Sequence, residues 1–277
     1  MRHDEVEGLS PGQFKRLTGV KRETFERMLS VLKQSEQQKK RSGRPSKLFL
    51  ADQLLLTLMY WREYRTQFHI AKSYGIHEAN ANRIIRKVEG ALAASGALKL
   101  PGKRAVRTDQ GVEISFVIVD VTETPIEKPK KKQCGCYSGK KKRHTLKAQV
   151  LLNWKTHEII ATAFGKGRTH DFKLFKHSRT HVHPQIMVLA DLGYLGLERL
   201  HAHSFMPTKA TKHHPLTYEE KHANRTLAHL RLHIEHVIGR LKVWRILAER
   251  YRGRRKRFGL RFNLIAGIHN VEIDLSS

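Results

Sequence analysis

The chain has little cysteine and no long apolar run. Only Cys134 and Cys136 occur among 277 residues, and they lie one residue apart in a Lys-rich stretch. This spacing offers no disulfide framework and fits a reducing cytoplasm. The longest apolar stretches, 48–61 and 114–121, are interrupted by polar residues or too short to cross a bilayer. The N-terminus lacks the apolar segment of a secretory signal. We therefore expect a soluble, cytoplasmic protein without a membrane partner.

Acidic residues are also scarce. There are 25 Asp and Glu against 53 Lys and Arg, which gives a formal net charge of +28. Such a charge opposes folding by self-repulsion and attracts polyanions. Nucleic acid is the leading partner, and an anionic membrane surface is the second. The basic residues run along the whole chain, so they do not form a detachable tail.

The pattern of apolar residues changes along the chain. In residues 10–32 the apolar side chains recur at helical spacing after Ser10 and Pro11, which are a typical N-cap and first-turn pair. A polar, basic linker follows over 33–47, and 48–98 is helical again. After Pro101-Gly102, strands are expected at 114–121, 145–153, 158–164 and 186–190, with helices at 171–178 and 227–247. This alternation indicates an α/β domain. We expect a helical segment and linker at 1–46, an all-α DNA-binding domain at 47–103, and a catalytic domain at 104–277.

Residues 67–85 fit a helix-turn-helix motif. Ala71 is small where two helices would touch, Gly75 allows a tight turn, and Ala81 and Ile84 would anchor the second helix. That helix would enter the major groove and read bases with its exposed early residues, which are His77, Glu78, Asn80, Asn82 and Arg83. An ordinary three-helix bundle has the same pattern, and the charge of the chain favours DNA binding. Residues 41–47 would be a minor-groove arm or a solvated linker.

Two expected strands carry an aspartate. Asp120 lies in the apolar run 114–121, whose composition indicates a strand buried on both faces. Asp191 follows the apolar run 186–190, and Gly193 then permits a sharp exit. A buried carboxylate requires a cationic partner, either a metal ion or, alternatively, an Arg or Lys side chain. Both aspartates would lie at strand ends, where α/β sheets place their ligand sites.

A third carboxylate lies on the helix expected at 227–247. Arg231, Glu235 and Lys242 share one face of that helix because they are separated by four and seven residues. They would form a surface salt-bridge ladder, or a site in which Glu235 binds a metal ion while Arg231 and Lys242 face phosphate. Three carboxylates without thiolates suit Mg²⁺ or Mn²⁺, and two such ions would cut and rejoin phosphodiesters without a protein nucleophile.

Other residues are less decisive. The basic stretch 128–147 predicts a hairpin or loop that grips the DNA backbone, with Lys140, Lys141, Lys142 and Arg143 at its centre. Asp171 is expected to cap the helix at 171–178, with Lys173 and Lys176 on the exposed side. No Cys and His pairs have zinc-finger spacing, so zinc is not expected. Trp154 and Trp244 are expected in the core.

The chain resembles bacterial insertion-sequence DDE transposases with an N-terminal helix-turn-helix and an uninterrupted catalytic domain. The resemblance rests on motifs in the same order along the chain: Asp120-Val-Thr-Glu-Thr-Pro125, Tyr137-Ser-Gly-Lys-Lys-Lys-Arg-His-Thr-Leu-Lys147, Gly167-Arg-Thr-His-Asp171, Asp191-Leu-Gly-Tyr-Leu-Gly196, and Arg231-Leu-His-Ile-Glu235 with Lys242. It implies an RNase H-like mixed sheet, with Asp120 on the first strand, Asp191 after the fourth and Glu235 on a late helix. It also implies metal binding by these three residues, and contacts from Arg231 and Lys242 to the phosphates of the transposon ends.

Two functions are therefore compared. The first is an active transposase that binds terminal inverted repeats, nicks them to free 3′-hydroxyls and joins these to a target. It would work on the bacterial nucleoid as a homodimer or larger assembly, because two ends must be held together. The second is a repressor or decayed element that binds DNA without cutting it. The complete set of carboxylates favours the enzyme, since a pure binding protein has no use for them.

Overall fold

The computed structural model describes residues 2–39, 46–107, 114–130, 133–213, 215–253 and 255–275. The chain divides into two compact units. The first contains residues 1–99, 241–249 and 260–277, and the second contains 100–240 and 250–259. The end of the chain thus groups with the N-terminal helices, whereas the sequence placed all of 104–277 together. The three-part functional division at 46/47 and 103/104 stays a prediction.

The first unit opens with three helices, α1 (Asp4–Glu7), α2 (Pro11–Thr18) and α3 (Arg22–Gln37). Ser10 caps α2 as expected, because its hydroxyl accepts a bond from the Gln13 amide and the Gln13 side chain bonds back to the Ser10 amide. Helix α3 continues to Gln37, so the linker predicted from Lys33 begins later than expected. Most of the arm predicted at 41–47 lies outside the described residues.

The next three helices match the spacing read from the sequence. They are α4 (Leu50–Glu63), α5 (Gln67–Ser73) and α6 (Glu78–Ala94). Ala71 and Ala81 are 1% and 0% exposed, and their small side chains allow α5 and α6 to approach closely. Gly75 turns the chain between them at φ +63°, a left-handed conformation that favours glycine. The predicted helix-turn-helix geometry is therefore confirmed.

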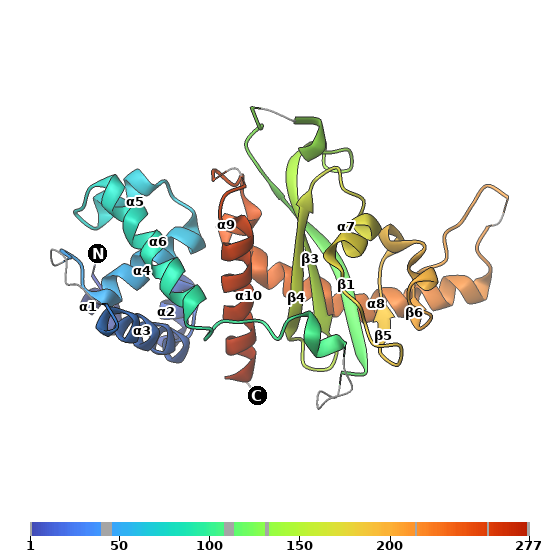
Figure 1. Cartoon of the computed structure of the whole chain (residues 1–277), viewed down its shortest axis with the longest axis horizontal. Helices are drawn as coiled ribbons and strands as arrows, with labels where there is room; N and C mark the ends of the chain where they lie inside the picture. The colour runs from blue at the N-terminus through green and yellow to red at the C-terminus, as the bar shows by residue number, and fades with distance from the viewer. Residues whose placement is uncertain are drawn as a thin grey trace. The chain divides into compact units, whose positions relative to one another are not determined.

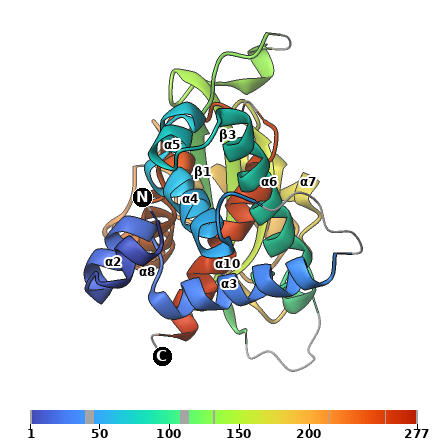
Figure 2. The ribbon, with the colours of Figure 1, turned by 90° about the vertical axis from the view of Figure 1, so that its left-hand side faces the viewer.

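The C-terminal elements of the first unit are α9 (Arg245–Ala248) and α10 (Phe258–Asp274). Figure 2 shows α10, in red, passing behind α4. Arg261 of α10 forms a buried ion pair with Glu89 of α6 at 2.6 Å, and Glu89 also accepts a hydrogen bond from the Trp61 indole. Trp244 is 5% exposed and packs edge-to-face on Trp61, so its predicted place in the core is confirmed.

The second unit is built on a mixed sheet. Its strands are β1 (Phe116–Pro125), β2 (Tyr137–Ser138), β3 (Arg143–Asn153), β4 (Ile159–Lys166), β5 (Met187–Leu189) and β6 (Ser204–Phe205). The order across the sheet is β2-β3-β1-β5-β6, and β4 also pairs with β3. Strand β1 is antiparallel to β3 and parallel to β5, which is parallel to β6. This RNase H-like arrangement confirms the predicted fold class.

Helices lie on both faces of the sheet, α7 (Asp171–Ser178) on one and α8 (Tyr218–Lys242) on the other (Figure 1). Short 3₁₀ turns, η1 (Lys103–Val106), η2 (Gln133–Cys136), η3 (Leu192–Tyr194) and η4 (Leu197–Arg199), connect these elements. The core beneath α7 contains Val117 and Val119 of β1, Phe175 and Tyr194. The helix predicted at 227–247 begins earlier than expected, at Tyr218, and ends at Lys242, before α9. Within the described residues no helix is long and apolar enough to cross a membrane.

Candidate active site

Asp120 lies on β1, and Asp191 lies two residues beyond the end of β5, the parallel neighbour of β1. The register pairs Ile118 of β1 with Leu189 of β5, and each aspartate lies two residues beyond its paired residue. Strand β5 ends at Leu189, whereas β1 continues to Pro125. The edge of β1 is therefore open beside Asp120, and the chain turns there at η3 as Asp191 accepts a 2.8 Å bond from the Gly193 amide. Both aspartates thus lie where the carboxyl ends of parallel strands form ligand sites.

Burial makes the Asp120 carboxylate costly to ionise. Its side chain is only 16% exposed. The pKa of Asp120 is raised from 3.8 to about 6, mainly by loss of solvent and in smaller part by the negative charges of Asp191 and Asp171. The Val121 amide, at 2.7 Å, and the Arg231 guanidinium act in the opposite direction without offsetting the burial. An additional positive charge beside Asp120 would therefore favour its ionised form.

Helix α8 brings Arg231 and Glu235 toward Asp120. One terminal nitrogen of Arg231 lies 3.8 Å from Asp120 Oδ2 and 3.6 Å from Glu235 Oε1. The alternatives considered from the sequence, an arginine partner for Asp120 and a salt bridge between Arg231 and Glu235, are thus both present. Glu235 is 51% exposed and faces away from the apolar stripe of Ile234 and Val237. Lys242 is exposed at the C-terminal end of α8, among the residues of the first unit.

The donor set of Asp120, Asp191 and Glu235 fits a hard divalent cation, since all three offer carboxylate oxygens. Among the described residues, no three His, Cys, Asp or Glu side chains are placed so that they could hold a metal ion together. The Arg231 guanidinium lies between Asp120 and Glu235, where it supplies positive charge to both. A cation between these carboxylates would therefore replace an existing ion pair, and the residues fit the metal after a movement of Arg231.

Asp171 has a different place from the one predicted. It is the first residue of α7, and the N-cap is His170, so the expectation that Asp171 caps this helix is wrong. Its Oδ1 accepts a 2.6 Å bond from Lys147 of β3. Lys147 is only 8% exposed, although the sequence placed it within the DNA-gripping basic stretch. Its position in a strand of largely buried residues was the signal available for this burial. Lys173 and Lys176 are exposed, as predicted.

The basic stretch forms a hairpin, which is one of the two predicted alternatives. Strand β2 pairs with the start of β3, Tyr137 opposite His144 and Ser138 opposite Arg143. The turn between them contains Lys142 at φ +51°. The side chains of Lys140, Lys141, Lys142 and Arg143 are all exposed. The hairpin thus presents a cluster of cations at its tip, a surface suited to phosphate contacts.

The second helix of the helix-turn-helix exposes most of the predicted base-reading residues. His77 is the N-cap of α6 and, like Glu78, Asn80 and Arg83, it is exposed. Arg83 donates a 3.0 Å bond to Asn80, which holds the two side chains together. Asn82 instead donates to Gln67 of α5 and is partly buried. Arg86, one turn after Arg83, is exposed on the same side and was missed from the sequence.

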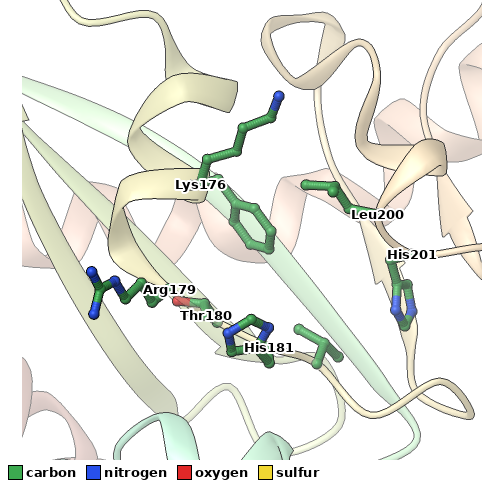
Figure 3. Close-up of a pocket in the computed structure, with 8 residues that line it drawn as sticks. Lys176, Arg179, Thr180, His181, Leu200 and His201 are labelled. Atoms are coloured by element: carbon green, nitrogen blue, oxygen red, sulfur yellow. The ribbon is translucent and has the colours of Figure 1, made fainter.

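A separate pocket lies at the C-terminal end of α7, lined in part by Phe175, Arg179, His181 and His201 (Figure 3). Lys176 at its rim extends over the Phe172 ring, 4.3 Å from the ring centre. None of the lining residues is a carboxylate. This pocket therefore lacks the acidic chemistry of the Asp120 and Asp191 site at the opposite end of the same helix.

Comparison with known proteins agrees with both parts of the structure. Residues 46–98 match the helix-turn-helix of DDE superfamily endonuclease, and residues 119–270 match the DDE superfamily endonuclease family itself. A protein from Microchaete diplosiphon named "Probable transposase for insertion sequence element IS702" is 44% identical over the whole of both chains. A relative from Streptomyces albus G, named for the transposase of insertion sequence element IS112, is 27% identical over 87% of this chain and 84% of its own length. The chain belongs to the DDE superfamily of endonucleases, among the transposases of insertion sequences.

Proposed function

We propose that this protein binds the terminal inverted repeats of its insertion sequence and catalyses metal-dependent cleavage and strand transfer. The observation that carries the proposal is the register of β1 and β5, in which Asp120 and Asp191 each follow a paired residue by two positions. Helix α8 adds Glu235 and Arg231 to the same site. In this proposal, three carboxylates from distant parts of the sequence would form one site in the second unit.

Asp120, Asp191 and Glu235 would hold Mg²⁺ or Mn²⁺, and two such ions would suit the chemistry of phosphodiester cleavage and joining. Such ions, when bound, activate the attacking water or 3′-hydroxyl and stabilise the leaving oxygen. Asp120 would be a less solvated ligand than Glu235, because its side chain is 16% exposed and that of Glu235 is 51% exposed. Glu235, which is half exposed, would approach from the helix side once Arg231 has moved.

Arg231 would change partners during the reaction. In the structure its guanidinium neutralises Asp120 and Glu235. Once a cation replaces it there, Arg231 is available to a DNA phosphate at the same site, because its planar donors match phosphate oxygens. Lys242 would supply a second phosphate contact from the end of the same helix. Both residues then position the DNA, while the carboxylates hold the reacting centre.

Recognition of the DNA would be divided between two surfaces. The exposed early residues of α6 would read bases in the major groove; these are His77, Glu78, Asn80 and Arg83, with Asn82 supporting them through Gln67. The hairpin tip at Lys140–Arg143 would contact the phosphate backbone without sequence preference. Double-stranded DNA, both transposon ends and target, is the partner, and a homodimer or larger assembly would hold two ends together.

The second candidate function is DNA binding without cleavage. The ion pairs of Arg231 with Asp120 and Glu235 favour it, because they give all three side chains a structural role without metal. The two functions differ in their response to added metal. Only the enzyme cuts DNA, and only the enzyme requires Glu235 for a step that comes after DNA binding.

The test is cleavage of a plasmid carrying the inverted repeats, comparing the wild type with Glu235→Gln and with Glu219→Gln. Glu219 is an exposed glutamate in the first turn of the same helix and serves as the matched control. We expect Mg²⁺- or Mn²⁺-dependent cleavage by the wild type and the control, and none by Glu235→Gln, with equal DNA binding by all three. Binding without cleavage by the wild type would support the second candidate. Cleavage by Glu235→Gln would remove Glu235 from the site.

A further inference from the structure

Three of the sequence motifs meet in one buried chain of charges. Glu123 comes from the motif that begins at Asp120, Lys147 ends the basic motif, and Asp171 ends the Gly-Arg-Thr-His-Asp motif. The Lys147 ammonium lies 2.6 Å from Asp171 Oδ1 and 3.9 Å from Glu123 Oε1. Glu123 and Lys147 are paired residues of β1 and β3, so their side chains share the face of the sheet that α7 covers. Glu123 is fixed in turn by the hydroxyls of Thr145, at 2.6 Å, and Ser138, at 3.2 Å.

This chain orients the second oxygen of Asp171 toward the candidate active site. A Cβ placed on Gly193 would lie 2.8 Å from Asp171 Oδ2 and 2.9 Å from Asp191 Oδ1. The two carboxylate oxygens therefore converge on one point above Gly193. Lys147 binds Oδ1, and no hydrogen bond from another described side chain reaches Oδ2. A Cβ at position 193 would crowd both carboxylate oxygens and force at least one of them to shift.

We infer that Asp171 is a further carboxylate of the active site, held by Lys147 and Glu123 so that its Oδ2 helps Asp120 and Asp191 to bind the divalent cation. The inference rests on the proposed function and adds to the three expected carboxylates. Lys147 and Glu123 are positioning residues, because they act through Asp171. Asp171 also lies at the N-terminus of α7, where the helix dipole stabilises a negative charge.

An ordinary structural ion pair does not account for this arrangement. A buried lysine with one carboxylate partner would satisfy both charges, but here Lys147 has two partners and Asp171 lies beside Asp191 as well. Carboxylates outnumber cations around this point, with Asp120, Asp171, Asp191 and Glu123 near Lys147 and Arg231. This excess of partly buried negative charge favours the binding of a further cation. A bound divalent cation removes the excess.

The test measures metal binding directly. Binding of Mn²⁺ to the full-length protein is followed by calorimetry and by the rise in thermal midpoint, for the wild type, Asp171→Asn and Lys173→Gln. Lys173 is exposed on the same helix and serves as the matched control. Because supporting groups around a metal typically change its affinity 10- to 100-fold, we expect Asp171→Asn to weaken Mn²⁺ binding on the order of tenfold or more. Lys173→Gln should bind Mn²⁺ as the wild type does.

Two further variants keep the test independent of folding defects. Gly193→Ala leaves every charge in place but puts a methyl group between the two carboxylates, and it should also weaken Mn²⁺ binding. Lys147→Met should weaken Mn²⁺ binding while leaving the salt dependence of DNA binding unchanged, because the lysine is buried. A change in that salt dependence would assign Lys147 to phosphate contact instead. Wild-type affinity for Mn²⁺ in both Asp171→Asn and Gly193→Ala would overturn the inference.

Failure of this inference is distinguishable from failure of the proposed function. If Asp120→Asn abolishes Mn²⁺ binding and Asp171→Asn does not weaken it, the active site stands without Asp171. If the wild type binds no Mn²⁺ and cuts no DNA, the proposed function itself fails, and the inference fails with it.

Discussion

Replacing Asp120 by Asn should make the metal-free protein more stable at neutral pH, although it removes a proposed ligand. Burial raises the pKa of Asp120 from 3.8 to about 6. The folded state therefore binds this proton more tightly than the unfolded state does. The contribution of Asp120 to stability becomes unfavourable as pH rises from 3.8 to about 6, and it stays unfavourable above that range.

The size of the effect can be worked out from the shift. One pKa unit corresponds to about 1.4 kcal/mol, so ionised Asp120 costs about 3 kcal/mol at pH 7. The attraction of Arg231 is already included, because it is one of the causes of the net shift. Asparagine has nearly the same shape and carries no charge. The thermal midpoint of Asp120→Asn should thus exceed that of the wild type by about 6 °C or more near pH 7.

The assay is thermal denaturation of both proteins in a chelating buffer, at pH 4 and at pH 7.5. At pH 4 the carboxyl of Asp120 is protonated in the folded state, so the two midpoints should nearly coincide. Saturating Mn²⁺ should reverse the order at pH 7.5, since only the wild type gains a full set of ligands. Equal midpoints at pH 7.5 without metal, or a gain for Asp120→Asn that is the same at both pH values, would refute the reasoning.

The other predictions concern packing, charge and DNA. Arg261→Met should cost about 3–5 kcal/mol, seen as a lower denaturant midpoint, because it takes the guanidinium away from the fully buried Glu89; a loss under about 1 kcal/mol would mean that the ion pair adds little. Gly267→Ala should cost about 2 kcal/mol in the same measurement, since a Cβ there would lie 2.1 Å from the Leu98 carbonyl oxygen; unchanged stability would show that α10 moves freely. Changing the hairpin residues Lys140–Arg143 together to Gln should weaken binding to any DNA sequence, and the slope of log affinity against log salt should fall by about 0.9 for each lost phosphate contact. A loss confined to the inverted repeats would instead assign base reading to the hairpin.

Much of the secondary structure was predictable because local patterns specify it. Ser10 and Pro11 began a helix as expected, and α7 has the predicted bounds of 171–178. The spacing of Ala71, Gly75 and Ala81 predicted the helix-turn-helix. The boundaries were less accurate at α3, which runs past the predicted end of its apolar pattern, and at α8, which spans Tyr218–Lys242 instead of the predicted 227–247. At these ends the polar residues continue the helix, so hydrophobic periodicity gives no signal there.

The sequence by itself determined most of the helices and strands, although not α10, together with the excess of positive charge and the three carboxylates in apolar or helical settings. Only the tertiary structure decided which side chains meet. The parallel register of β1 and β5 sets Asp120 beside Asp191, and the pairing of β1 with β3 buries Lys147 between Glu123 and Asp171. It also turned Asn82 toward Gln67, away from the exposed face of α6. These contacts join residues far apart in the chain, and strand register depends on how whole faces pack rather than on the spacing within any one segment.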